Sequence, residues 1–326
     1  MKNEIITVET TAVVGTKNFF ATDLVNRWIS FAGVSEKSAS TYKTALKQLA
    51  KFFTANAIIN PRREDLEQWR DELIAAKKSP ATIQLYLTAT KIFYRWLAQE
   101  NLYPNIADHL KNKVKINHEH KKDALTAKQA GTLLKTVDAT PLKSKRFKEI
   151  KIKRDKAIVA LMFSCGLRCV EVSRLDVSDM QPEFGRTYLL IQGKGHASKD
   201  AKVLLPTQVE TLIREYLNER GASDGAMFVS HANRNNGARI STQVISKMVK
   251  ANLRAVGMDS KRLTAHSLRH TAATTMILAG VELTKVQQVL RHVNINTTMI
   301  YNNAVERMKN TAEQTAANAI FDTLSA

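Results

Sequence analysis

Histidine, arginine and tyrosine side chains recur at short intervals near the C-terminal end of this 326-residue chain. His266 and Arg269 are three residues apart, a spacing that places both side chains on one face of a helix. His292 and Tyr301 would face opposite sides of one straight helix, so they can meet only if residues 293–296 form a turn. With that turn, two imidazoles, a guanidinium and a phenol converge.

These four side chains suit chemistry on a phosphate. A guanidinium binds phosphate oxygens through planar, bidentate hydrogen bonds, and an imidazole can hydrogen-bond the same group or carry a proton. A phenol beside a phosphate can act as a nucleophile. The pattern therefore predicts phosphoryl transfer.

The charge of the chain indicates the partner that would carry the phosphate. The 49 Lys and Arg residues exceed the 30 Asp and Glu residues, which gives a formal net charge of +19. Such an excess usually means a polyanionic partner, and we favour nucleic acid over a membrane because no basic amphipathic anchor stands out. No run of eighteen apolar residues predicts a membrane-spanning helix, and the N-terminus lacks the apolar core of a signal peptide. We expect a cytoplasmic protein.

Neither a metal nor another cofactor is predicted. The two cysteines, Cys165 and Cys169, are too few for a disulfide framework or a four-ligand zinc site. His266 and His270 have the spacing of a metal-binding pair, but Ser267 stands where a His-Glu-x-x-His motif needs glutamate, and no third ligand is clear. His270 is therefore expected to pack or to hydrogen-bond within its helix.

Hydrophobic periodicity divides the chain into an arm, two domains and a linker. After an N-terminal arm over residues 1–20, residues 21–112 show four or five amphipathic helices, one of which begins at the Ser79-Pro80 cap. Five lysines with almost no large apolar residue follow between Lys111 and Lys122, and they predict a basic linker over 113–123. The fold class is mainly α (α+β), with an all-helical N-terminal domain.

The second domain, over residues 124–326, is predicted to be mostly helical with a small antiparallel sheet. Thr126 is a suitable cap for its first helix, and residues 188–192 and 201–205 read as the two strands of a hairpin. Residues 227–229 are a further short strand candidate. A terminal helix over about 311–324 carries an apolar stripe.

Taken together, the motifs resemble those of the tyrosine recombinases. Leu161 to Val172 resembles the first arginine patch of that family, with its arginine at Arg168, and His266-Ser267-Leu268-Arg269-His270-Thr271 resembles its His-x-x-Arg patch. Leu290-Arg291-His292 followed by Tyr301 resembles its third patch and nucleophile, and Gly193-Lys194-Gly195 lies where the family keeps a hairpin lysine. Each motif alone is weak, but all occur in family order between about residues 20 and 310.

The resemblance implies a role for each residue in cutting DNA. Tyr301 would attack the scissile phosphate and leave a 3′-phosphotyrosyl link with a free 5′-hydroxyl. Arg168 and Arg269 would grip the non-bridging oxygens, the electrostatic contribution that usually dominates such reactions. His266 and His292 would hydrogen-bond the phosphate, and His266 is also a candidate acceptor of the tyrosine proton.

Two further residues have supporting roles in this scheme. Lys194 would protonate the departing 5′-oxygen as the general acid, although Lys199 and Lys202 are neighbours that could substitute for it. Glu171, one helical turn from Arg168, would orient the groups of the active site. Arg291 departs from the family, which most often has glycine before the histidine, and its role is left open.

The resemblance also implies the assembly. The helical N-terminal domain is SAM-like and binds core DNA, and the two domains form a clamp around a double-stranded recombination site. Two protomers occupy one core site and four form the synapse, which exchanges strands through a Holliday junction; accessory DNA-bending proteins are a further partner that the resemblance allows. The terminal helix would dock on a neighbouring protomer, or alternatively cover its own domain. Integration, excision, inversion and dimer resolution all remain open.

Three other functions compete with recombination. A type IB topoisomerase shares the chemistry, a non-catalytic DNA-binding protein would explain the charge alone, and a metal hydrolase would use the histidine pair. Tyr301 also has an ordinary alternative as a core aromatic residue that closes the last helices.

Overall fold

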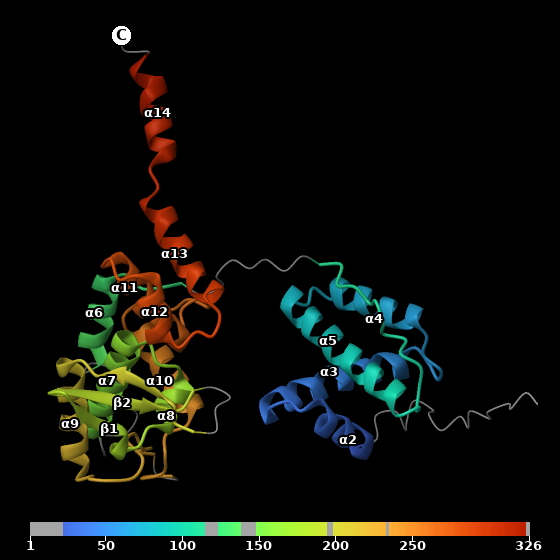
Figure 1. The fold of residues 1–326 in the computed structure, drawn as a ribbon, viewed down its shortest axis with the longest axis horizontal. Helices are drawn as coiled ribbons and strands as arrows, with labels where there is room; N and C mark the ends of the chain where they lie inside the picture. The colour runs from blue at the N-terminus through green and yellow to red at the C-terminus, as the bar shows by residue number, and fades with distance from the viewer. Residues whose placement is uncertain (1–21, 115–122, 138–147, 194–197, 233–234, 324–326) are drawn as a thin grey trace, which may run out of the picture. The chain divides into compact units, whose positions relative to one another are not determined.

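A computed structural model describes residues 22–114, 123–137, 148–193, 198–232 and 235–323 (Figure 1). The chain divides into two compact units, Met1–His118 and Glu119–Ala326. The mainly helical fold class with a small antiparallel sheet is confirmed. The predicted N-terminal arm, and residues 115–122 of the predicted linker, lie outside the described residues.

The N-terminal unit is a bundle of helices that pack around aromatic side chains. Trp28 and Phe93 meet edge to face with ring centroids 5.2 Å apart, and both are fully buried. The predicted cap at Ser79 is confirmed, since its side chain accepts a hydrogen bond from the Thr82 backbone N–H at 3.2 Å. The helices are α2 (Thr22–Ala32), α3 (Glu36–Ala55), α4 (Arg63–Ala75) and α5 (Pro80–Gln99).

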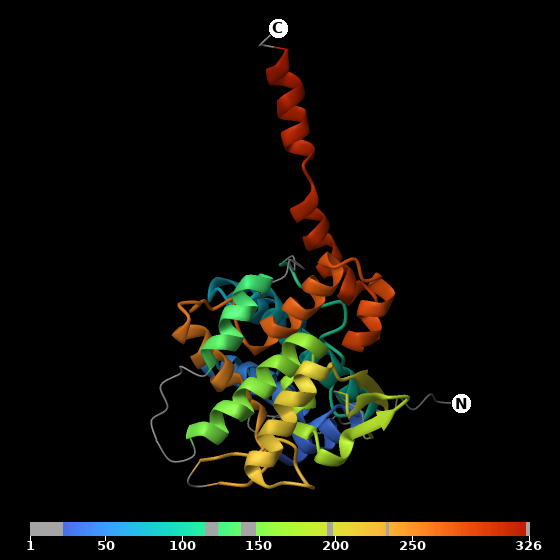
Figure 2. The ribbon, with the colours of Figure 1, turned by 90° about the vertical axis from the view of Figure 1, so that its left-hand side faces the viewer.

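The C-terminal unit places its helices around a larger aliphatic core. The buried helix α7 runs through this core, and α9 packs along it (Figure 2). The predicted cap at Thr126 is confirmed, because its side chain accepts a hydrogen bond from the Gln129 backbone N–H at 3.2 Å. The helices up to the sheet are α6 (Ala127–Thr136), α7 (Lys148–Cys165), α8 (Cys169–Arg174) and the short 3-10 helix η2 (Val177–Asp179). Those after it are α9 (Thr207–Arg220), α10 (Thr242–Ala255), α11 (Ala265–Leu278), α12 (Leu283–Leu290), α13 (Asn296–Lys309) and α14 (Ala312–Asp322).

The sheet has three antiparallel strands in sequence order: β1 (Met180–Glu183), β2 (Arg186–Ile191) and β3 (Ala201–Leu204). The predicted hairpin corresponds to β2 and β3. Strand β1 was not predicted, because Pro182 lies within its four residues; the strand tolerates proline because it forms the edge of the sheet. The candidate strand at 227–229 was wrong, since only isolated bridges form there, among them Val229 with Arg239.

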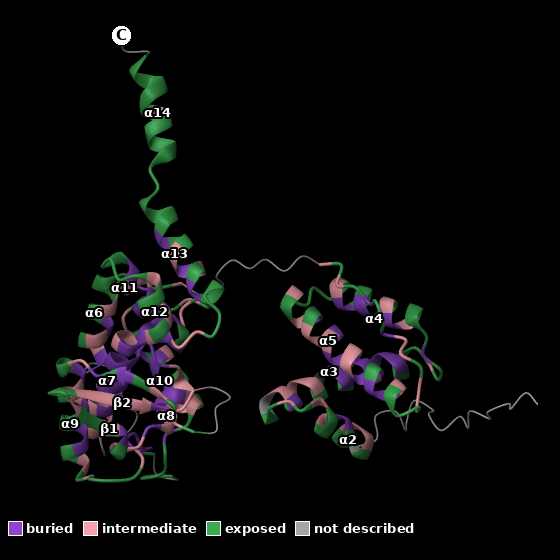
Figure 3. Ribbon diagram, in the orientation of Figure 1, coloured by how far each residue is buried: buried purple, intermediate pink, exposed green. Residues whose placement is uncertain are grey.

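A small second core joins the last helices of the C-terminal unit. Its buried members come from α11, α12 and α13, and they are separate from the main core. They are Ala273, Ile277, Val286, Leu290, Tyr301 and Val305. Helix α14 follows, and none of its residues is buried (Figure 3). Among the helices in the described parts of the chain, none has the length and hydropathy needed to cross a membrane.

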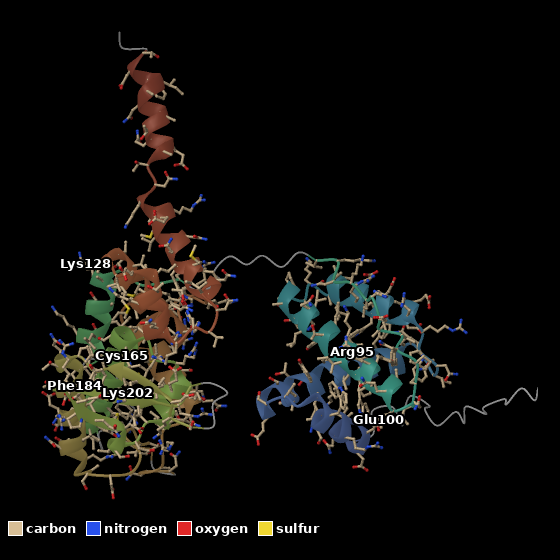
Figure 4. The ribbon with its side chains drawn as sticks, viewed as in Figure 1. Arg95, Glu100, Lys128, Cys165, Phe184 and Lys202 are labelled. Atoms are coloured by element: carbon tan, nitrogen blue, oxygen red, sulfur yellow. The ribbon has the colours of Figure 1, made fainter. Side chains whose placement is uncertain are left out.

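Separate cores make the two units respond separately to a core mutation. Phe93→Ala should destabilise the N-terminal unit by about 3–5 kcal/mol, because it removes a buried ring and leaves a cavity. Hydrogen exchange of the full chain should speed up in α2–α5 while α7 and α11 keep their protection. Arg95→Ala, on the exposed face of the same helix (Figure 4), is the matched control and should leave both units unchanged. Loss of protection in α7 would contradict independent cores.

Candidate active site

A buried carboxylate organises the start of helix α8. Glu171 has no solvent exposure, and its Oε2 accepts a hydrogen bond from the backbone N–H of Arg168 at 2.8 Å. Its Oε1 accepts a second bond from the Arg168 guanidinium at 2.7 Å. Carboxylates are favourable in the first turn of a helix, where backbone N–H groups lack partners. The Glu171 side chain therefore holds both the backbone and the guanidinium of Arg168 in place.

Arg269 enters the site from α11 and is held by backbone oxygens of two other segments. Its guanidinium donates to the carbonyl oxygens of Gly166 and Leu290, and its side chain is only 1% exposed. Its Nη1 also lies 3.9 Å from Glu171 Oε2. Burial and the neighbouring charge of Arg168 lower the pKa of Arg269 to about 9. It is still protonated at neutral pH, so the site keeps its positive charge.

Gly166 permits this close approach. Its φ is +59°, a left-handed conformation that favours glycine, and an added Cβ would lie 2.6 Å from Cδ2 of Leu290. Any larger residue would therefore push apart the turn after α7 and the end of α12, the two segments whose carbonyl oxygens accept hydrogen bonds from Arg269. This close packing explains why glycine stands at position 166, two residues before Arg168 in the first motif.

Arg291, whose role the sequence leaves open, is also bound to Glu171. It ends α12 in a left-handed conformation with φ of +55°. Its Nη2 lies 2.7 Å from Glu171 Oε2, and its Nη1 donates to the Val289 carbonyl oxygen at 2.6 Å. Burial alone would raise the pKa of Glu171, but Arg291, followed by the Arg168 backbone N–H, outweighs burial and holds it below the usual value.

The Tyr301 ring lies among histidines. Its centroid is 5.0 Å from that of His270 and 6.2 Å from that of His292, and His270 in turn lies 4.6 Å from His266. The predicted turn is confirmed, because residues 291–295 separate α12 from α13 and bring His292 back to Tyr301. Periodicity had shown His270 on the face of His266, but not its contact with Tyr301.

Both Tyr301 and His292 have perturbed acidities. Burial raises the pKa of Tyr301, and the charges of Arg269 and Arg168 offset only part of this effect. Burial also lowers the pKa of His292 to about 3, helped by Arg269 and Arg168. His292 is therefore a neutral ring at physiological pH, and its Nδ1 is 2.8 Å from the hydroxyl of Thr298.

The hairpin lysines are distinguished by their partners. Lys194 lies outside the described residues. Lys199 Nζ lies 2.8 Å from Asp176 Oδ2 and 2.6 Å from Asp179 Oδ2, and these hydrogen bonds raise its pKa despite burial. Lys202 (Figure 4), on β3, has its Nζ 2.6 Å from Oε2 of Glu183 on β1. Both alternatives to Lys194 are therefore bound in ion pairs, Lys199 with the carboxylates of η2 and its cap and Lys202 with a carboxylate of β1.

The structure brings six of the seven predicted site residues into one region. Arg168 and Arg269 both form ion pairs with Glu171. The ring of Tyr301 stacks directly on His292 and is connected to His266 through His270. Among the residues that the structure describes, no group of three His, Cys, Asp or Glu side chains is arranged to hold a metal ion. Guanidiniums next to a tyrosine and neutral imidazole are suited to binding a phosphodiester.

Comparison with known proteins identifies the family. Residues 123–308 match the phage integrase family, and residues 26–101 match the phage integrase N-terminal SAM-like domain. The tyrosine recombinase XerD of Lacticaseibacillus casei is 32% identical over 230 residues, which cover 69% of this chain and 72% of XerD. XerC of Corynebacterium glutamicum is 30% identical over 273 residues, 81% of this chain and 82% of that protein.

Solved structures show the same fold. The XerH site-specific recombinase bound to a palindromic difH substrate has a TM-score of 0.74 at 20% identity, covering 94% of this chain and 96% of XerH. A lambda integrase dimer bound to a COC′ core site has a TM-score of 0.64 at 15% identity, covering 86% of this chain and 76% of that chain. The chain belongs to the phage integrase family, and it is a tyrosine recombinase, a site-specific DNA recombinase enzyme.

The low pKa of His292 predicts how its ring titrates. Because protonation would place a cation among Arg168, Arg269 and Arg291, the ring should stay neutral from pH 8 down to pH 5. NMR of ring carbons in selectively labelled protein would check this, with His292→Gln to assign the signal. In Arg269→Met the midpoint should rise, because one neighbouring charge is removed. A midpoint near 6.5 in the wild type would contradict the electrostatic description.

Proposed function

We propose that this enzyme cleaves and rejoins DNA at specific sites through a covalent bond to Tyr301. The observation that supports this best is the grouping of Arg168 and Arg269 around one buried carboxylate, next to a tyrosine in contact with two imidazoles. A phosphodiester placed against the guanidiniums would lie within reach of the tyrosine. The family membership makes DNA the expected source of that phosphate.

The charges of the site match the change in charge during the reaction. Three guanidiniums, those of Arg168, Arg269 and Arg291, surround the single negative charge of Glu171, so these four groups carry a net charge of +2. A phosphodiester brings one negative charge, and more develops on its non-bridging oxygens in the transition state. The excess positive charge is therefore best neutralised in the transition state.

The proposed reaction exchanges one phosphate ester for another, so the bond energy of the DNA backbone is kept in the phosphotyrosyl link. The Tyr301 oxygen attacks phosphorus and forms a 3′-phosphotyrosyl ester, while the bond to the 5′-oxygen breaks. The tyrosine proton passes to His266, and Lys194 gives a proton to the departing 5′-oxygen. Attack by the 5′-hydroxyl of a partner strand reverses these steps, so neither ATP nor a metal ion is required. His266 is exposed, and its ring contacts His270, which in turn contacts the ring of Tyr301.

Lys194 is proposed as the general acid on the evidence of its neighbours. Lys199 and Lys202 are held in ion pairs, and the raised pKa of Lys199 makes it a poorer proton donor. The Gly193 carbonyl, next to Lys194, accepts a hydrogen bond from Arg174 at 3.1 Å. The start of the hairpin loop is thus attached to α8, the helix that follows Arg168.

The proposed partners are double-stranded DNA and further copies of the same chain. Two protomers would bind one core site, and four would form a synapse that exchanges strands through a Holliday junction, with accessory DNA-bending proteins in some systems. Binding should weaken steeply with salt, because a chain with a net charge of +19 would neutralise several phosphates. Integration or excision of a mobile element and dimer resolution are the proposed roles, in the cytoplasm where the DNA lies.

The main test concerns the nucleophile. Tyr301→Phe should bind DNA with wild-type affinity but form no covalent adduct, because only the attacking oxygen is removed. A nicked suicide substrate and denaturing electrophoresis measure the adduct. Tyr188→Phe, a tyrosine on β2 of the same unit, is the matched control and should form the adduct normally. An adduct that persists in Tyr301→Phe would disprove the assignment.

A topoisomerase would share this adduct but not the need for a site. Type IB relaxation of a supercoiled plasmid occurs on any sequence, whereas recombination requires two copies of the core site. Family membership favours recombination. Plasmids with no, one and two copies of the footprinted site separate the two activities.

The terminal helix is proposed to dock on a neighbouring protomer. Helix α14 has no buried residue, and its apolar side chains Ile320 and Phe321 are 63% and 64% exposed. Deletion of residues 312–326 should spare binding of one protomer to a half-site but abolish cooperative assembly. Gel shifts on half-sites and full sites measure both effects. Unchanged synapsis would show that α14 instead serves its own domain.

A further inference from the structure

Arg291 connects two elements that carry the site. Its Nη2 contacts Glu171 Oε2 at 2.7 Å, and its Nη1 donates to the Val289 carbonyl oxygen at 2.6 Å. Its side chain is 12% exposed, so the ion pair is largely shielded from water. The guanidinium therefore bridges the end of α12 and the start of α8.

The backbone conformation at position 291 would favour glycine over arginine. With φ at +55° and ψ at +47°, Arg291 adopts the left-handed conformation that glycine occupies without strain. Observed strain of this kind is a reason to look for a function of the side chain. Here the side chain makes two short hydrogen bonds that glycine could not make.

Few other cations could pair with Glu171, the carboxylate that Arg291 binds. Glu171 is faced by Arg168 from the start of α8, by Arg269 from α11 and by Arg291 from the end of α12. Arg269 is 3.9 Å away and is already bound to the Gly166 and Leu290 carbonyl oxygens. The thiol of Cys165, whose pKa burial raises to about 12, is neutral and supplies no charge. Without Arg291, only Arg168 would pair closely with the buried carboxylate.

We propose that Arg291 is a positioning residue of the cleavage reaction, which locks the Glu171 carboxylate so that it holds the Arg168 guanidinium toward the phosphate. The inference rests on the proposed function and deepens it. Among the separate interactions that lower the pKa of Glu171, the charge of Arg291 is the largest, and the backbone N–H of Arg168 follows. In its absence, burial would favour the protonated acid, which binds Arg168 less strongly.

The test compares adduct formation by four proteins on a nicked duplex that carries the footprinted core site. They are the wild type, Arg291→Gly, Glu171→Gln and the double variant, each at saturating DNA from pH 5.5 to pH 8. Glycine suits the left-handed backbone, so Arg291→Gly removes the guanidinium without adding strain. Arg291→Lys keeps the charge but makes fewer hydrogen bonds, and it should recover part of the rate.

The expected effect grows as the pH falls. Glu171 is ionised in the wild type over this range, whereas in Arg291→Gly it takes up a proton toward low pH. The ratio of wild-type to Arg291→Gly rates should therefore rise by about threefold or more from pH 8 to pH 5.5. In the Glu171→Gln background, the same replacement should change the rate by less than about twofold at every pH, because residues that act through one another are not additive.

Three outcomes would overturn the proposal. They are equal rates for Arg291→Gly and wild type at every pH, a ratio that does not change with pH, and an equally large effect in the Glu171→Gln background. The last would mean that Arg291 contacts the phosphate directly. Lys77→Gly is the matched control: it removes a positive charge at another position with positive φ (53°), in the N-terminal unit, and it should show no pH-dependent ratio. Absence of any adduct with the wild type would instead refute the proposed function itself.

Discussion

The site depends on one buried negative charge. Glu171 has no exposure to solvent, and an isolated carboxylate in that position would be costly. It is stable as an anion because three guanidiniums surround it. They belong to Arg168 at the start of α8, Arg269 on α11 and Arg291 at the end of α12. In turn, those cations can be gathered in one place because the carboxylate lies between them. The carboxylate is thus the organising group of a site whose substrate is also an anion.

This arrangement solves a problem of charge repulsion. Arg168, Arg269 and Arg291 would repel one another in a partly dry site without a counter-ion. Glu171 reduces that repulsion but does not cancel it: burial is the main cause of the lowered pKa of Arg269, and the charge of Arg168 lowers this pKa by more than the charge of Glu171 raises it. The remaining positive charge is available to a phosphodiester. Removing Glu171 would therefore weaken the site in a different way from removing an arginine.

Much of the architecture was predictable because it depends on local signals. The caps at Ser79 and Thr126 and the hairpin of β2 and β3 followed from residue types and periodicity. Strand β1 was missed because Pro182 removes the usual strand signal, and tertiary pairing at a sheet edge overrides it. The resemblance to the tyrosine recombinases identified the residues of the third motif, but it could not show Arg291 against a carboxylate 120 positions away.

The two readings of Tyr301 turned out to be compatible. The residue is 4% exposed and packs in the small core of the last helices, as a structural tyrosine would. It also contacts His270 and His292, as a nucleophile in a phosphate site would. Sequence alone could not separate these readings, because burial and function use the same aromatic ring. Burial also raises its pKa, so the phenol keeps its proton until a base accepts it.

The small core around Tyr301 is packed separately from the main core of the same unit. Its buried members come from α11, α12 and α13, whereas the guanidinium of Arg168 belongs to a helix that packs in the main core. Units with few buried contacts open at a lower free energy than whole domains. Local opening of α13 is therefore expected to cost less free energy than unfolding of the main core that holds Arg168. The packing of Tyr301 is thus set by a handful of side chains on the last helices, directly before the exposed helix α14.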